Sequence, residues 1–179
     1  MEKSNSGNCT KLILDHKWDY ALFDCDNENK SIKLYKHFLT SKNICEIFKK
    51  YNVPKDIDYI SIDVDSADLW LFEALLKEYK AKLFSVEHNC HFPTNRAITR
   101  LNNTNGWNYD RLYGASLKAL NLLAESYGYT LIWVVEEFDA FFIRNDLIKK
   151  DLEFYKPNLN KWKKYTNLIC HAPVKDKKD

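Results

Sequence analysis

Short runs of β-branched and aromatic residues alternate with helical patterns along most of this chain, and this alternation limits the folds open to it. The strand-like runs cover residues 20–24, 37–40, 59–64, 83–87, 129–135 and 140–143. Between several of them, apolar residues recur at the spacing of one helix face. Alternating strands and helices are typical of βαβ units. The sequence therefore predicts a largely parallel α/β sheet, in which the last two runs form an antiparallel pair.

Serine, glycine and proline predict where the helices begin and end. Ser41 and Ser66 each precede an apolar helical pattern and are expected to begin a helix. Ser116 precedes the last such pattern, and Gly128 follows it where helices favour a left-handed residue. The helix after Ser41 must end before Pro54, because proline cannot continue a helix.

Size and composition indicate one domain with an ordinary core. The chain has 179 residues, of which 45% are hydrophobic, and we place an α/β domain at 1–148 and an aromatic- and lysine-rich tail at 149–179. The net charge of +2 argues against nucleic acid and anionic membranes as partners. Neither a signal peptide nor a membrane-spanning run is found, so we expect a cytoplasmic protein. Scattered cysteines indicate reduced thiols: Cys9, Cys25, Cys45, Cys90 and Cys170.

Acidic residues end three of the predicted strands. Asp24 ends the first run and Asp26 follows it, Asp63 and Asp65 lie at the end of the third, and Glu87 ends the fourth and is followed by His88. Ligands of open α/β sheets bind outside the carboxyl ends of the strands. Carboxylates gathered there repel one another unless cations, hydroxyls or amides compensate them. The pattern therefore favours a functional site over helix capping, although a capping role stays open for Asp65 alone.

An Asp-x-Asp sequence after a strand has several known uses. It resembles the nucleophile motif of haloacid-dehalogenase phosphatases and the metal-binding motif of nucleotide-sugar glycosyltransferases. The residues after each motif depart from the phosphatase pattern, and 179 residues are few for a glycosyltransferase. A metal-dependent phosphatase or glycosyltransferase using Asp63 and Asp65 is therefore the weaker alternative. We assign no residue to a metal site, while a divalent metal held by Asp63, Asp65 and Glu87 stays open.

Four longer segments occur in one order and spacing: 58–70 (DYISIDVDSADLW), 84–93 (FSVEHNCHFP), 113–119 (YGASLKA) and 139–144 (DAFFIR). Together they resemble a branch of the FkbM-like class I methyltransferases, which use S-adenosyl-L-methionine (AdoMet). The resemblance covers roughly residues 7 to 147. It implies a Rossmann-like, mostly parallel sheet with helices on both faces, and methyl transfer to an oxygen or nitrogen of a small-molecule or glycan-like acceptor.

The resemblance also implies roles for individual residues. Three would lie near the cofactor: Asp24, Asp26 and Asp63. Three are candidates for the group that removes the acceptor proton: Asp65, Glu87 and His88. Three more would face the acceptor: Asn89, His91 and Arg96. The last three belong to the polar segment 89–113, which we interpret either as a lid or acceptor-recognition loop or as a solvated surface loop.

The sequence departs from this family at its beginning. The family starts with a strand and a glycine-rich cofactor loop, and residues 7–10 resemble only the tail of that loop. The first strand is therefore expected to be absent, between the strands at 20–24 and 59–64. Three explanations then stay open. The two strands pair directly with each other, another chain supplies the missing strand, or the sequence is a fragment of a longer protein. A non-catalytic module that keeps the fold for binding or assembly is the main alternative function.

Overall fold

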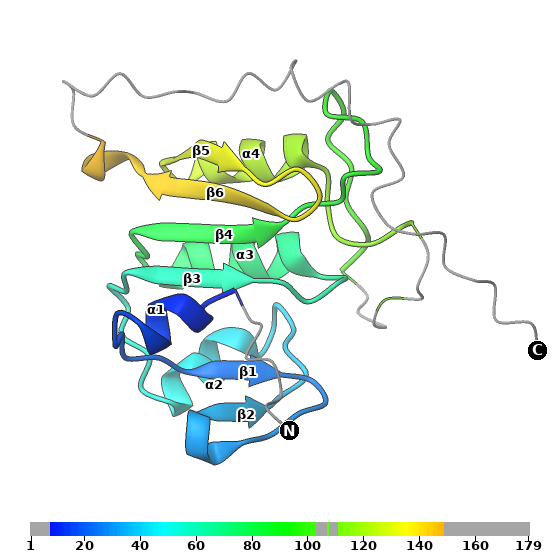
Figure 1. Cartoon of the computed structure of the whole chain (residues 1–179). Helices are drawn as coiled ribbons and strands as arrows, with labels where there is room; N and C mark the ends of the chain where they lie inside the picture. Colours follow the sequence, from blue (N-terminus) through cyan, green and yellow to red (C-terminus); the bar gives the residue numbers. More distant parts are fainter. Residues whose placement is uncertain (1–7, 103–106, 108–110, 149–179) are drawn as a thin grey trace, which may run out of the picture.

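The computed structural model describes residues 8–102, 107 and 111–148, and these form a mixed α/β structure (Figure 1). The elements, in chain order, are α1 (Thr10–Leu14), β1 (Leu22–Asp24), η1 (Lys30–Ile32), β2 (Leu34–Lys36), α2 (Ile44–Lys50), β3 (Tyr59–Ile62), α3 (Asp68–Glu78), β4 (Leu83–Glu87), α4 (Leu117–Ser126), β5 (Tyr129–Val134), β6 (Asp139–Arg144) and η2 (Asn145–Leu147). The predicted tail at 149–179 lies outside the described residues.

The strands form two sheets. One is a parallel pair, β1-β2, and the other has the order β3-β4-β6-β5. Strands β3 and β4 are parallel, whereas β6 lies between β4 and β5 and is antiparallel to both. The predicted antiparallel pair is therefore confirmed. The direct pairing considered for the strands at 20–24 and 59–64 is wrong, because β1 and β3 belong to different sheets.

The core lies between the four-stranded sheet and the helices α3 and α4. Phe72 of α3 packs against Phe84 of β4 and Phe142 of β6, with ring centroids 5.0 and 5.4 Å apart. All three side chains are fully buried. Burying large aromatic side chains supplies much of the free energy that holds a helix on a sheet. This packing fixes α3, and with it the short loop that joins β3 to α3.

The opposite face of this sheet is covered only in part by described residues. Figure 1 shows α1 on that side and the other helices behind the sheets. Leu12 and Trp18, from the N-terminal segment, border a cavity of about 490 Å³ whose floor includes Tyr59, Leu83 and Phe141. Among the described residues, α1 is the one helix on this face and has five residues, so the structure is mixed α/β and the expected helix layer on both faces is not established.

The ends of the helices follow the sequence in some places and not in others. Ser116 caps α4 by accepting a hydrogen bond from the Ala119 amide, and Gly128 has a positive φ of 78° after the helix, as predicted. The helix α2 ends before Pro54, also as predicted, but its N-cap is Asn43 rather than Ser41. The helix α3 begins at Asp68 with Ala67 as its N-cap residue, one residue later than an N-cap at Ser66 predicts.

Asp65 explains the late start of α3. Its φ of 57° is left-handed, so the chain turns at this residue before the helix can begin. The capping role left open for Asp65 is therefore wrong, because the N-cap residue of α3 is Ala67. The weaker strand expected at 37–40 is also displaced, and β2 ends one residue before it.

The cysteines do not all behave as predicted. Cys9, Cys25 and Cys45 are free thiols, whereas Cys90 is disulfide-bonded, which corrects the expectation for that residue. Cys170 lies outside the described residues. Within the described part of the chain, none of the helices combines the length and the apolar character needed to cross a bilayer.

Candidate functional site

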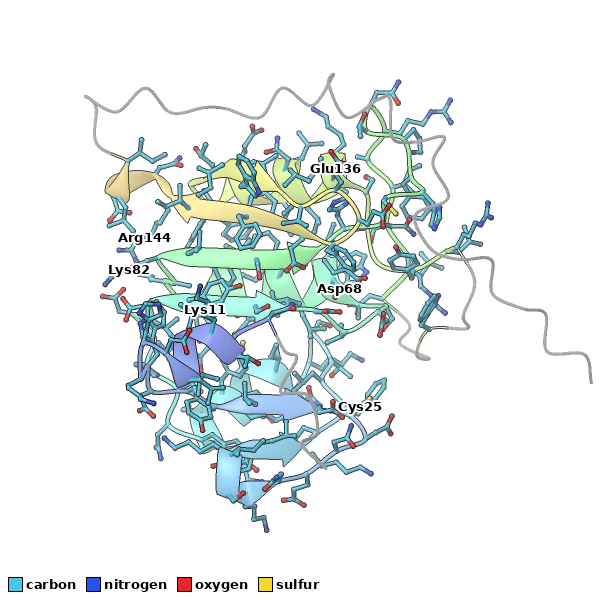
Figure 2. The ribbon with its side chains drawn as sticks, in the orientation of Figure 1. Lys11, Cys25, Asp68, Lys82, Glu136 and Arg144 are labelled. Carbon is cyan, nitrogen blue, oxygen red and sulfur yellow. The ribbon has the colours of Figure 1, made fainter. Side chains whose placement is uncertain are left out.

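The parallel strands β1, β2, β3 and β4 all end at one edge of the molecule (Figure 1). Cys25, directly after β1, and Asp68, at the start of α3, both lie on this side in Figure 2. Lys82 and Arg144 lie on the opposite side. The predicted acidic residues therefore share one edge of the structure, as the rule for open α/β sheets expects.

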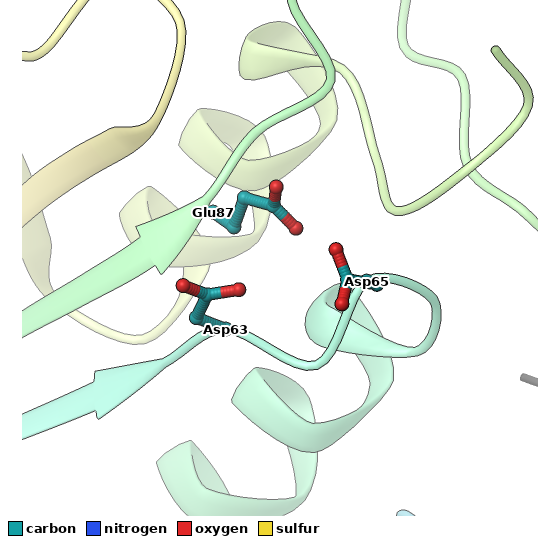
Figure 3. Close-up of side chains that lie close together, drawn as sticks. All are labelled: Asp63, Asp65 and Glu87. Carbon is teal, nitrogen blue, oxygen red and sulfur yellow. The ribbon is translucent and has the colours of Figure 1, made fainter. Parts of the chain in front are cut away.

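Asp63, Asp65 and Glu87 converge at the ends of β3 and β4 (Figure 3). One carboxylate oxygen from each residue lies within 4.8 Å of the other two. Asp63 directly follows β3 and Glu87 is the last residue of β4, and the two strands pair in parallel register up to Ile62 and Val86. Neighbouring strand ends thus supply two carboxylates. The left-handed turn at Asp65 directs the third carboxylate back toward them.

Two further carboxylates adjoin this cluster, and sequence reasoning missed both. Asp68 is completely buried, and its Oδ1 accepts a hydrogen bond of 2.8 Å from the Val64 amide. Asp139 of β6 is the register partner of Glu87 in β4. The spacing of Asp63, Asp65 and Asp68 contained a signal, because Asp68 comes three residues after Asp65. For Asp139 the sequence offered only its place directly before the predicted strand at 140–143.

Burial and mutual repulsion raise the pKa values of these carboxyl groups. Burial, together with the neighbouring carboxylates, raises the pKa of Glu87 to about 9. For the same reasons the pKa of Asp68 rises to about 7 and that of Asp139 to about 6. Partial desolvation also raises the pKa of Asp63. At neutral pH the cluster therefore holds at least one proton unless a cation replaces it.

Asn8 connects the N-terminal segment to the cluster. Its Nδ2 donates weak hydrogen bonds of 3.3 to 3.5 Å to Ser61, Asp63 and Asp139. Ser61 accepts a hydrogen bond of 3.0 Å from the hydroxyl of Ser85 in β4. Asn8 belongs to the segment 7–10, so residues assigned to the tail of a cofactor loop lie against the ends of β3 and β6.

His88 is placed less favourably for catalysis than the sequence suggested. It is buried, and its Nε2 lies 3.3 Å from the carbonyl oxygen of Val135. Burial lowers the pKa of His88 to about 4, so the ring is neutral at pH 7. A carbonyl oxygen needs a donor, so Nε2 carries the hydrogen and cannot accept a proton at the same time.

Asn89 holds the segment after β4 together. It is completely buried, and its Nδ2 donates to the carbonyl oxygens of Arg111 and Tyr113 at 2.9 and 2.8 Å. Its Oδ1 accepts from the His91 amide at 2.8 Å. These three bonds join both ends of the loop that was expected to recognise an acceptor. The predicted acceptor residue Arg96 is exposed.

Asp24 and Asp26 lie apart from the cluster, at the end of β1 in the other sheet. The Oδ1 of Asp24 accepts hydrogen bonds of 2.7 Å from the amides of Asp26 and Asn27. Burial favours the neutral form of this carboxyl group, but the two amides and the Asn27 side chain outweigh it and lower the pKa. Asp24 is therefore an ionised carboxylate. Asp26 is exposed beside it.

Comparisons with known proteins give no match, whether with protein-family models, curated proteins or solved structures. The chemistry of the site therefore has to be inferred from its own residues. Three carboxylates that converge at one edge can remove a proton from an acceptor or bind a hard cation. The ionised carboxylate of Asp24, at the end of β1, can accept hydrogen bonds from hydroxyl groups of a ligand.

Proposed function

We propose that the chain is a methyltransferase domain of the FkbM-like class I type, which transfers a methyl group from AdoMet to an oxygen or nitrogen of a small-molecule or glycan-like acceptor. The strand arrangement supports this proposal. Strands β1 and β2 are parallel, β3 and β4 point the same way, and β1 and β3 are not paired (Figure 1). The resemblance expects an additional central strand between these two, in a Rossmann-like sheet.

Asp24 fits the part of the site that would bind AdoMet. Its carboxylate is ionised and fixed by two backbone amides, and only its Oδ1 has hydrogen-bond partners among the described residues. Its second oxygen can therefore accept a hydrogen bond from a ribose hydroxyl group. Asp26 lies beside it, and Asp63 directly follows β3, the strand on the other side of the gap between the two sheets. AdoMet, when bound, would supply a methyl group activated by a positively charged sulfur.

Asp65 is the best candidate for the group that accepts the acceptor's proton. Methylation of a hydroxyl or amine releases one proton, which a nearby base must take. Asp65 is exposed at the edge. Glu87 is protonated at neutral pH, since its pKa is about 9, and Nε2 of His88 is engaged with a carbonyl oxygen. We therefore assign the base to Asp65, and positioning of the loop after β4 to Asn89.

The test is calorimetric titration of the folded chain with AdoMet and with its demethylated product, both in EDTA. Binding of both ligands is expected, and Asp24→Asn should weaken it by about tenfold, because asparagine keeps one acceptor oxygen but loses the charge. Asp19→Asn is the matched control, since Asp19 is exposed, pairs with Lys33 and precedes β1. The absence of heat at millimolar ligand from folded protein would overturn the proposal.

A second candidate is a metal-dependent phosphatase or glycosyltransferase, which the convergence of Asp63, Asp65 and Glu87 favours. Such an enzyme would release phosphate from a phosphate ester, or transfer a sugar from a nucleotide sugar, only with a divalent cation present. Magnesium-dependent phosphate release that is lost in Asp63→Asn would favour it over methyl transfer. Binding of AdoMet without turnover of any acceptor would instead favour the non-catalytic module.

A further inference from the structure

We infer that Asp63, Asp65 and Glu87 form a binding site for one divalent cation of the hard, oxygen-preferring class: Ca²⁺, Mg²⁺ or Mn²⁺. Each residue supplies one carboxylate oxygen, and carboxylates are the ligands these cations prefer. The carboxylates come from the ends of two paired strands and from the turn that follows β3. Cation binding here does not require that the domain transfers methyl groups.

The distances between the ligand atoms suit such an ion. Ca²⁺ binds oxygen at about 2.3–2.6 Å, so two ligands on opposite sides of it can lie about 5 Å apart. The three oxygens lie within 4.8 Å of one another, so Ca²⁺ could reach all of them after at most a small approach of the side chains. Mg²⁺, with bonds of about 2.0–2.1 Å, would require a larger approach. Ca²⁺ is therefore expected to bind with the least rearrangement.

Glu87 supplies the independent observation that indicates a ligand. The residue is only 8% exposed, and its Oε2 has no hydrogen-bond partner among the described residues. Figure 3 shows this carboxylate pointing toward Asp63 and Asp65. A buried carboxylate oxygen without a partner is unfavourable, because it has lost its water without gaining a donor. A cation between the three carboxylates would supply the missing partner.

Two further carboxyl groups surround the three ligand oxygens. Asp68 is completely buried, its Oδ2 lacks a hydrogen-bond partner within the described part of the chain, and Asp139 lies opposite Glu87. Of the ion pairs among the described residues, none includes Asp68, Glu87 or Asp139. The other end of the same sheet differs, because acidic residues there pair with Lys82 and Arg144. Asp68, Glu87 and Asp139 thus gather at the edge where the three oxygens converge, without such an ion pair among the described residues.

Calorimetric titration of the EDTA-treated, dialysed full chain with CaCl₂, MgCl₂ and MnCl₂ tests the site. One cation per chain is expected, with Asp65→Asn weakening binding on the order of tenfold or more. Asparagine tolerates the left-handed backbone at this position, so the variant should fold. Asp58→Asn is the matched control, because Asp58 is exposed, pairs with Lys82 and lies at the other end of β3. Equal affinity of wild type and Asp65→Asn would overturn the inference.

A measurement on the wild-type chain makes the test independent of any variant. Mn²⁺ broadens the NMR signals of nearby amides, so signals from 63–68 and 87–89 should be lost first. Broadening centred elsewhere, or none at millimolar Mn²⁺, would overturn the inference. The cation titrations contain no AdoMet and the AdoMet titrations contain EDTA, so the failure of one proposal leaves the other separately testable.

Discussion

Two strand ends on the same edge of this protein hold carboxylates in opposite electrostatic states. At the end of β1, Asp24 is surrounded by backbone amides, which lower its pKa. At the end of β4, Glu87 is buried among other carboxylates, which together with the loss of water raise its pKa to about 9. An acidic residue at a strand end therefore has no fixed protonation state. Its state depends on which dipoles and charges the fold places around it.

The largest expected effect is a pH dependence of stability caused by the cluster. Folded Glu87 keeps its proton up to about pH 9, whereas the unfolded side chain loses it near about pH 4.3. The folded state therefore binds more protons between these values, and the free energy of unfolding must fall as pH rises through this window. Asp68 and Asp139, with pKa values of about 7 and about 6, add to the fall at its lower end.

Urea denaturation in EDTA from acidic to alkaline pH measures this fall. Glu87→Gln should stabilise the protein at pH 9 by roughly 3 kcal/mol, because it removes the ionisation that folding opposes. Asp58→Asn is the control, since that exposed residue pairs with Lys82 away from the cluster. A wild-type stability that stays level across this range would show that the carboxylates of the cluster are compensated, as Asp24 is.

A somewhat smaller effect is expected from the cation itself. Ca²⁺ at about 100 times its dissociation constant should stabilise the folded chain by about 2.7 kcal/mol. In a protein of this size that raises the midpoint of thermal unfolding by roughly 5–10 °C. The increase should be much smaller in Asp65→Asn and unchanged in Asp24→Asn. An equal increase in all three proteins would mean that the cation binds elsewhere.

The smallest effect concerns the end of β1. Asp24→Ala removes the acceptor of the Asp26 and Asn27 amides and should cost about 1–2 kcal/mol at pH 7. Because the folded pKa of Asp24 is lowered, its stabilisation is present at neutral pH and is lost as pH falls through that pKa. Glu87→Gln should have its effect at the opposite end of the pH range. If both variants changed stability over the same pH window, the contrast between the two strand ends would be wrong.

Local sequence signals predicted much of the fold. The runs at 59–64 and 83–87 contain β3 and β4, and α4 lies between Ser116 and Gly128 as expected. These predictions succeeded because β propensity and helix capping depend on residues close together in the chain. One signal failed where the backbone conformation of a neighbouring residue competed with it. Ser66 does not begin α3, since the chain first makes a left-handed turn at Asp65.

The candidate site was likewise predicted in part from the sequence. The acids at the strand ends can be recognised from the sequence alone, because alternating apolar residues mark where each strand ends. Only the tertiary structure decided that Glu87 meets Asp63 and Asp65, since this depends on the parallel register of β3 and β4. It also decided that Asp139, 52 positions after Glu87, adds its charge, because β6 pairs with β4. Burial sets the pKa values, and burial is a property of packing between segments far apart in the chain.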